Sequence, residues 1–429
     1  MAPAVSAMRV TGTPERADVA GIERELRRLW SSLDGDPAPS GAASASAQIT
    51  RICTLTLLAV VRNGRPRPAA ALVERLGERY PSRSIVLDLK RTEDPRTRQD
   101  GRLDVEITLH CHARGLTGRQ AVCCEQIAVT ASGRAIARVP ALILPLLVPD
   151  LPVYVWCSDD PPAGGPATAG APVPATGGTG GSATVGPAPD PASEVLRRLT
   201  EVADVLIVDS AVMRRPVAGL AAAAAFARPL PGGLRDLAWG RLTPWRDVIV
   251  QCFDPAPMRQ ALDRLEHVRV RTEGNSSDSS DHSGAAGPSS NKREPIAGLL
   301  LGAWLAGRLG WEPAGPALRH GGTLSVSFRR DGGQLDLDIE GGAGPIVSFE
   351  CSASGSDPFA LSITRRTGGA AAVDIETSPG RGRPRTTAAG LAALDEAALV
   401  AAELELTGTD HVLREALEIV FRMMHEVGS

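Results

Sequence analysis

Strand-like and helix-like patterns alternate through the first two thirds of the chain. Apolar runs predict strands over 52–61, 84–89, 103–112, 121–130, 151–156, 204–210 and 265–270. Helical spacing of apolar residues predicts helices over 68–79, 133–147, 193–203 and 243–253. A strand, a helix and a second strand in that order form a parallel crossover unit. Residues 49–272 are therefore predicted to form an α/β domain with a mixed or parallel sheet.

The pattern changes after residue 294. An apolar helix is predicted over 296–309, and short segments of alternating polarity follow over 323–329, 334–340, 346–351, 359–364 and 371–376. Leu324, Val326 and Phe328 show the alternation, which is typical of strands with one covered face. Helices over 387–405 and 410–427 are expected to cover that face. The pattern predicts a smaller α+β domain over 295–429, built on an antiparallel meander.

The first 48 residues are predicted to hold an amphipathic helix and a flexible segment. Thr13, Pro14 and Glu15 together form a helix start. Apolar side chains then recur at helical spacing, at Ile22, Leu26, Leu29, Trp30 and Leu33. The apolar face of this helix must dock either on the protein's own core or on a partner.

Three polar stretches lack the apolar content that would offset the entropy of ordering them. They cover residues 34–47, 161–189 and 273–293. Because strand and helix patterns continue on both sides of 161–189, we interpret it as a disordered insertion within the α/β domain. Residues 273–294 are predicted to link the two domains.

Composition narrows the classes of partner. The chain of 429 residues carries a net charge of −3 and 3% aromatic residues, which argues against a nucleic-acid binder and a polybasic membrane-surface protein. The longest apolar run, 139–156, contains four prolines and Asp150, so it predicts core rather than a membrane span. Seven cysteines at irregular spacing fit a cytoplasmic protein with mostly buried thiols.

Common catalytic and cofactor motifs are missing from the sequence, including the glycine-rich dinucleotide and phosphate loops. We therefore expect no cofactor. A His110-Cys111-His112 segment faces Cys123 and Cys124 across the predicted hairpin. Three interpretations stay open: a zinc site, a half-buried hairpin with small apolar thiols, or a redox pair of Cys111 with Cys123 or Cys124.

Two carboxylates lie at the ends of predicted strands, where open parallel sheets bind ligands. Asp150 precedes one strand and Asp209 ends another. Each could hold a ligand hydroxyl or serve as a cap or turn residue. The ligand interpretation supports an alternative function, an α/β enzyme acting on a sugar phosphate or a nucleotide.

Several segments, in order along the chain, together resemble one known family. They are 51–55 (RICTL), 80–86 (YPSRSIV), 124–127 (CEQI), 144–156 (LPLLVPDLPVYVW), 203–210 (ADVLIVDS), 236–246 (DLAWGRLTPWR) and 304–311 (WLAGRLGW). The set resembles the glucose-6-phosphate dehydrogenase assembly protein family, OpcA, of cyanobacteria and actinobacteria.

This resemblance implies a non-catalytic accessory protein. It would bind glucose-6-phosphate dehydrogenase, promote its assembly or active form, and so support NADPH production in the oxidative pentose phosphate pathway. The dehydrogenase would hold the NADP and sugar-phosphate sites. The family is also associated with thioredoxin-linked redox control, for which Cys111, Cys123 and Cys124 are the candidate thiols.

Contact residues for the dehydrogenase are expected within the family-like segments. Trp and Arg are frequent energetic anchors of protein interfaces. The candidates are Asp150, Trp156, Trp239, Trp245 and Arg246. Core packing is the competing explanation for the Trp side chains.

Overall fold

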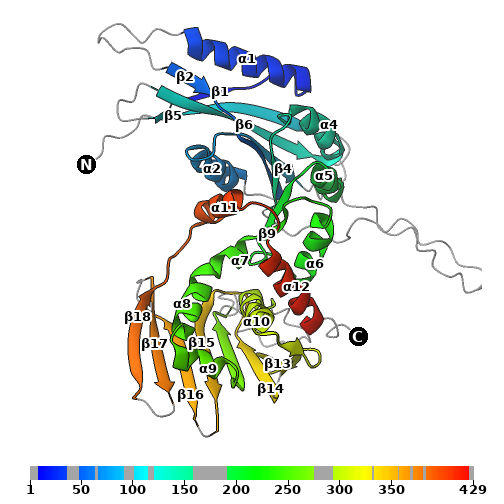
Figure 1. Cartoon of the computed structure of the whole chain (residues 1–429). Coiled ribbons are helices and arrows are strands. Elements are labelled where there is room, and N and C mark those ends of the chain that lie inside the picture. The colour runs from blue at the N-terminus through cyan, green and yellow to red at the C-terminus, as the bar shows by residue number, and fades with distance from the viewer. Residues whose placement is uncertain are drawn as a thin grey trace, which may run out of the picture. The chain divides into compact units, whose positions relative to one another are not determined.

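Two sheets organise the chain (Figure 1). The computed structural model describes residues 8–35, 48–62, 66–90, 101–114, 120–157, 191–274, 293–330, 333–355, 357–367, 371–379 and 383–424. The chain divides into two compact units. Unit 1 contains Met1–Val208 and Ala222–Leu234, and unit 2 contains Asp209–Ala221 and Arg235–Ser429.

The first sheet mixes parallel and antiparallel pairs, as expected from the sequence. Its order is β1 (Met8–Gly12), β5 (Leu103–Arg114), β6 (Gln120–Ser132), β4 (Ser82–Lys90), β3 (Leu55–Arg62), β7 (Val153–Cys157), β8 (Val205–Val208) and β9 (Gly233–Asp236). Strands β6, β4, β3, β7 and β8 run parallel, whereas β1, β5 and β6 pair antiparallel. Helix α5 (Pro191–Thr200) lies between β7 and β8 in the chain, which confirms the crossover unit.

Helices cover both faces of this sheet. Cys124 of β6 contacts Gly77 of α2 (Pro66–Gly77), whereas the next residue, Glu125, bonds to Trp30 of α1 (Val19–Gly35). Successive strand residues point to opposite faces, so the two helices lie on opposite sides. Ile22, Leu26 and Leu29 are at most 2% exposed, so the apolar stripe of α1 docks on the protein's own core.

The helix predicted over 133–147 is a succession of short turns. They are η1 (Gly133–Arg138), α4 (Val139–Ile143) and η2 (Leu144–Leu146). Pro140 and Pro145 each fall at a start of one of these turns, because proline cannot donate the backbone bond that a continuous helix needs.

The second sheet corrects one expectation. Its order is β11 (Glu312–Pro313), β13 (Thr323–Arg330), β14 (Gly333–Glu340), β10 (His267–Thr272), β15 (Ile346–Ala353), β16 (Phe359–Arg365), β17 (Ala372–Pro379) and β18 (Arg385–Gly390). Strand β10, which we expected to close the α/β domain, lies between β14 and β15 and is parallel to β14. The meander is therefore interrupted. Val268 and Val270 face inward and their neighbours outward, as on a sheet with one covered face.

Helices α10 (Ile296–Leu309) and α12 (His411–Met424) pack together in unit 2 (Figure 1). A Cβ atom at Gly298 would lie 2.5 Å from Ile339 of β14, so the missing side chain lets α10 approach the sheet closely. The helix predicted from residue 387 is wrong at its start. Residues 385–390 pair with β17, and α11 (Glu396–Glu405) begins where Asp395 accepts a bond from Ala398 N at 2.8 Å.

The remaining elements were not expected from the sequence, apart from α8. They are β2 (Gln48–Arg51), α6 (Pro216–Ala227), α7 (Leu237–Arg241), α8 (Thr243–Phe253), α9 (Ala256–Leu262) and β12 (Leu318–His320). The three polar stretches lie mostly outside the described residues. The expected boundaries of the domains stay a prediction. Within the described part of the chain, no helix is long and apolar enough to cross a membrane.

Candidate functional site

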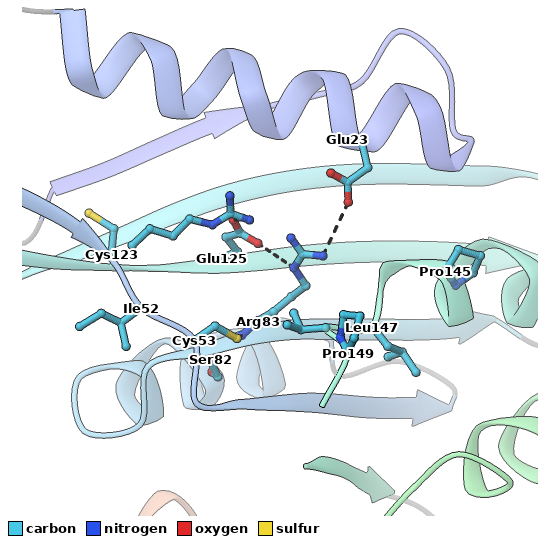
Figure 2. Close-up of a pocket in the computed structure, with 12 residues that line it drawn as sticks. Glu23, Ile52, Cys53, Ser82, Arg83, Cys123, Glu125, Pro145, Leu147 and Pro149 are labelled. Atoms are coloured by element: carbon cyan, nitrogen blue, oxygen red, sulfur yellow. Dashed lines mark hydrogen bonds and ion pairs between the residues drawn. The ribbon is translucent and has the colours of Figure 1, made fainter. Parts of the chain in front are cut away.

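A cavity of about 480 Å³ opens in unit 1 beside the first sheet (Figure 2). Five separate parts of the chain line it: α1, the end of β2 with its link to β3, the start of β4, the middle of β6, and η2 with the turn that follows it. The lining residues are Glu23, Arg51, Ile52, Cys53, Ser82, Arg83, Cys123, Glu125, Pro145, Leu147, Val148 and Pro149.

A buried ion pair forms the floor of the cavity. Arg83 Nε donates to Glu125 Oε2 at 2.7 Å, and the two side chains are 9% and 5% exposed. A second nitrogen of the guanidinium, Nη1, donates to the carbonyl oxygen of Leu146 at 2.8 Å. Removing two charges from water is costly, and the close pairing and additional bond offset that cost.

Two more donors converge on Glu125. Arg51 Nη2 lies 2.7 Å from Oε1, and Trp30 Nε1 donates to the same oxygen at 2.8 Å. The Arg51 guanidinium also lies over the Trp30 ring, 5.4 Å from its centroid. Both oxygens of Glu125 are therefore occupied by donors.

Strand register explains why two arginines meet one glutamate. Strands β2 and β4 both pair with β6 in parallel, one after the other along its length. Arg51, the last residue of β2, lies opposite Cys123, and Arg83 near the start of β4 lies opposite Glu125. Residues two apart on a strand share a face, so both guanidinium groups flank Glu125 where one strand ends and the next begins.

A disulfide bond stands at the edge of this cavity. Cys111 of β5 and Cys123 of β6 lie directly opposite each other and are joined by an S–S bond, and Cys123 lines the cavity. Of the candidate redox thiols, the structure thus joins Cys111 to Cys123. Cys124 points to the opposite face, where its buried Sγ lies 3.5 Å from the carbonyl oxygen of Gly77 and takes no part in the disulfide.

The histidines of the same hairpin face away from the disulfide. His110 pairs with Gln126 at 3.0 Å and with Glu74 at 3.1 Å, and burial lowers its pKa despite Glu74. His112 lies 3.9 Å from Glu78. Among the described residues no group of His, Cys, Asp and Glu side chains is arranged to hold a metal ion. Only Cys124 shares the face of the histidines, which corrects the idea that Cys123 could join them.

The three predicted Trp anchors are core residues. Trp156, Trp239 and Trp245 are 2%, 4% and 2% exposed. This burial supports core packing as the explanation for the three Trp side chains, and their contact with a partner stays a prediction. Arg246 is partly exposed and lies over the Trp239 ring at 3.7 Å, and burial lowers its pKa to about 10.

Asp150 and Asp209 occupy different settings. Asp150 is exposed with φ of 61°, which places it in a left-handed turn that Asp tolerates better than most residues. Asp209 is buried and accepts two bonds of 2.7 Å from Arg241. Its carboxylate is engaged and is not offered to a ligand hydroxyl, which weakens the enzyme alternative.

Two buried carboxyls in unit 2 have raised pKa values. Asp236 accepts bonds from Ser210 N and Oγ at 2.9 and 2.6 Å, yet its burial and the nearby Asp209 raise its pKa to about 6. Burial also raises the pKa of Glu403 to about 7, although Arg235 lies 3.9 Å away. Arg235 itself is 1% exposed.

Our sequence reasoning missed Arg51, Arg83 and Glu125. Each lies in a segment quoted above for the family resemblance, but nothing in the sequence showed that these segments meet. The placement of β2 and β4 on one edge of β6 depends on long-range pairing that local patterns do not encode. A charged residue inside an apolar strand, as at Glu125, was the available signal, because such a side chain needs a partner.

The chain is similar to proteins of one known family. Residues 73–168 match the model of the glucose-6-phosphate dehydrogenase subunit N-terminal domain, and residues 232–417 match that of the C-terminal domain. Together these matches cover more than half of the chain. The OxPP cycle protein OpcA of Synechocystis sp. is 24% identical over 227 residues, which are 53% of this chain and 38% of that protein.

A second relative is the OxPP cycle protein OpcA of Nostoc punctiforme. It is 23% identical over 281 residues, which are 65% of this chain and 45% of the relative. The chain thus spans less than half the length of these two curated relatives. Among solved structures, an NAD-binding oxidoreductase from Klebsiella pneumoniae is 9% identical, with a TM-score of 0.44 and coverage of 86% of this chain and 96% of that one.

Both halves of the family's domain pair occur here in the same order. The chain belongs to the glucose-6-phosphate dehydrogenase assembly protein family, OpcA.

Proposed function

We propose that this protein is a non-catalytic assembly factor and allosteric activator of glucose-6-phosphate dehydrogenase. It would thereby support NADPH production in the oxidative pentose phosphate pathway. The observation that carries the proposal is the match of both glucose-6-phosphate dehydrogenase subunit domains. The engaged Asp209 carboxylate agrees with a role without chemistry of its own.

Activation would proceed by a population shift. An activator favours the active form of its partner only as far as it binds that form more tightly than the inactive one. A tenfold shift in the equilibrium of the dehydrogenase therefore requires tenfold tighter binding to its active form. Because the three Trp rings are buried, we propose Arg246 and Asp150 as contacts that keep exposed surface.

The decisive experiment mixes the purified full chain with the dehydrogenase of the same organism. We expect the two to co-elute and the KM for glucose 6-phosphate to fall. The chain alone should not reduce NADP with glucose 6-phosphate. Absence of a complex together with an unchanged KM would refute the activator role, and turnover by the chain alone would refute its non-catalytic nature.

Arg246 can be tested in the same assay. Arg246→Gln should weaken the complex about thirtyfold, since arginines at interface centres often contribute about 2 kcal/mol. Arg366→Gln is the matched control, because Arg366 is exposed in unit 2 and pairs with Asp374 at 2.6 Å. Equal affinities of both variants would remove Arg246 from the contact surface.

Thioredoxin is a further proposed partner, acting on the Cys111–Cys123 disulfide. In this exchange the disulfide is reduced to two thiols while the dithiol of thioredoxin is oxidised to a disulfide. After incubation with reduced thioredoxin, alkylation and mass spectrometry should show two additional labelled cysteines. Cys124→Ser should not change that gain, whereas Cys111→Ser should abolish it. No gain in the unaltered protein would contradict the proposal.

The proposed activator role also places the protein in the cytoplasm with the dehydrogenase. We expect it to bind neither nucleic acid nor a membrane. Cell fractionation checks this point. Recovery of the chain mainly with the membrane pellet would contradict it.

A further inference from the structure

We propose that the unit 1 cavity binds a small organic oxyanion, a phosphate monoester or a carboxylate on an uncharged body. The anionic group would pair with Arg51 and Arg83, and the body would lie along the apolar wall. This inference concerns unit 1 alone and does not rest on the proposed interaction with the dehydrogenase.

Unused hydrogen-bond donors in the cavity point to an anion. Within the described part of the chain, Arg51 uses Nη2 towards Glu125, and its Nε and Nη1 have no bond. Arg83 uses Nε and Nη1, and its Nη2 has none. Both oxygens of Glu125 already accept bonds, so the floor of the cavity offers donors rather than acceptors. Guanidinium groups bind carboxylates and phosphates through paired N–H donors.

The net charge at the floor of the cavity also favours an anionic ligand. Arg51, Arg83 and Glu125 together carry one net positive charge at the floor of the cavity. Glu23 of α1 is the remaining carboxylate, and its Oε1 lies 3.6 Å from Arg83 Nη1 (Figure 2). That distance exceeds a hydrogen bond, and the Glu23 side chain is 40% exposed. Glu23 therefore occupies the place of an anion loosely, and an incoming oxyanion can displace it.

The remaining lining determines the size and character of the body. A volume of about 480 Å³ falls within the range of small-molecule sites. Ile52, Leu147 and Val148 supply apolar surface, and Pro145 and Pro149 stiffen the turn that carries it. An inorganic ion would leave this apolar wall without a partner, so an organic molecule with an anionic group fits better.

Calorimetric titration of the full chain, without the dehydrogenase, tests the assignment. The probes are inorganic phosphate, glucose 6-phosphate, AMP and the monocarboxylate butyrate, which separate phosphate esters from carboxylates. We expect at least one organic probe to bind saturably and at least about tenfold more tightly than inorganic phosphate. No saturable binding by any probe would overturn the proposal, and equal affinity for all four would overturn the organic body.

Two variants should move the affinity in opposite directions. Arg51→Gln should weaken binding of the best probe by at least about tenfold, because one charge-assisted contact is lost. Glu23→Gln should strengthen it severalfold, because the competing carboxylate is removed. A merely structural role of either residue would not predict opposite signs.

Matched controls stand outside the cavity. Arg102→Gln removes an exposed arginine of unit 1 that pairs with Asp104 at 2.6 Å. Glu25→Gln makes the same change of charge as Glu23→Gln on the same helix, where Glu25 bonds to Arg28. Neither should change the affinity. Effects of the controls as large as those of Arg51→Gln and Glu23→Gln would overturn the site in favour of general surface charge.

Discussion

Each unit buries an arginine against a glutamate, and the two pairs differ in how well they are satisfied. In unit 1, Arg83 and Glu125 lie 2.7 Å apart, and Arg51 and Trp30 also donate to the glutamate. In unit 2, Arg235 and Glu403 lie 3.9 Å apart. The first pair borders a cavity, whereas Arg235 is only 1% exposed.

The difference shows that burial of an ion pair alone does not create a ligand-binding site. The Arg83–Glu125 pair is closely bonded and still leaves donors towards open space, which suits ligand binding. The Arg235–Glu403 pair is looser and enclosed, so the pKa of Glu403 rises to about 7 and the acid is partly protonated near neutral pH. We therefore expect the unit 2 pair to govern stability and its pH dependence, and the unit 1 pair to govern recognition.

The largest expected effect comes from Arg235→Met. Arg235 also donates to the carbonyl oxygen of Gly408, so this change leaves both that oxygen and the Glu403 carboxylate without it. Loss of one partner of a buried ion pair costs about 3–5 kcal/mol. Denaturant unfolding of the full chain at pH 8 should show a loss of this size. At pH 5 the loss should be smaller, because Glu403 then carries a proton.

The control for this variant is the exposed Arg366→Gln, which should leave the free energy of unfolding almost unchanged because an exposed ion pair is screened by water and salt. A loss at pH 8 no larger than that of the control would contradict the importance of the Arg235–Glu403 pair.

The next effect is the pH dependence that Glu403 imposes. Its pKa is about 7 in the folded protein, against an ordinary value of 4.5. Between these values the folded state binds more protons than the unfolded state, so the stabilisation is complete below about pH 4.5 and is lost as pH rises through about 7. The full difference is on the order of 3 kcal/mol. Asp236, with a pKa of about 6, acts in the same direction at slightly lower pH.

Glu403→Gln isolates this contribution. The free energy of unfolding, measured from pH 4.5 to 8, should decline less steeply in the variant than in the unaltered protein. Parallel curves would show that Glu403 titrates alike in both states.

A smaller loss is expected for Glu125→Gln in unit 1. The change removes the anion that Arg83 and Arg51 share, but water can enter the adjoining cavity and Glu23 lies 3.6 Å from Arg83. We expect a cost of about 2 kcal/mol, below that of Arg235→Met at pH 8. Denaturant unfolding of both variants in one buffer tests the order, and a reversed order would break the comparison between the two pairs.

The sequence predicted the features of the fold that depend on local patterns and missed those that depend on long-range pairing. The periodicity of single elements located the 243–253 helix and the 296–309 helix at the bounds that the structure shows. It could not place β10, because a strand of alternating polarity fits either sheet until its neighbours are known. For the same reason the sequence could not predict that Arg51 and Arg83 both lie beside Glu125. Their approach depends on the pairing of β2 and β4 with β6.

The smallest expected effect on stability belongs to Arg51→Gln, and it separates folding from recognition. The Arg51 side chain is 55% exposed, and Glu125 keeps its bonds to Arg83 and Trp30 when Arg51 is gone. Because partly exposed ion pairs contribute little, the free energy of unfolding should change by at most about 1 kcal/mol. The same variant should lose at least about tenfold in affinity for the oxyanion probe. A large loss of stability with unchanged affinity would instead make Arg51 a structural partner of Glu125 and leave the cavity without its proposed role.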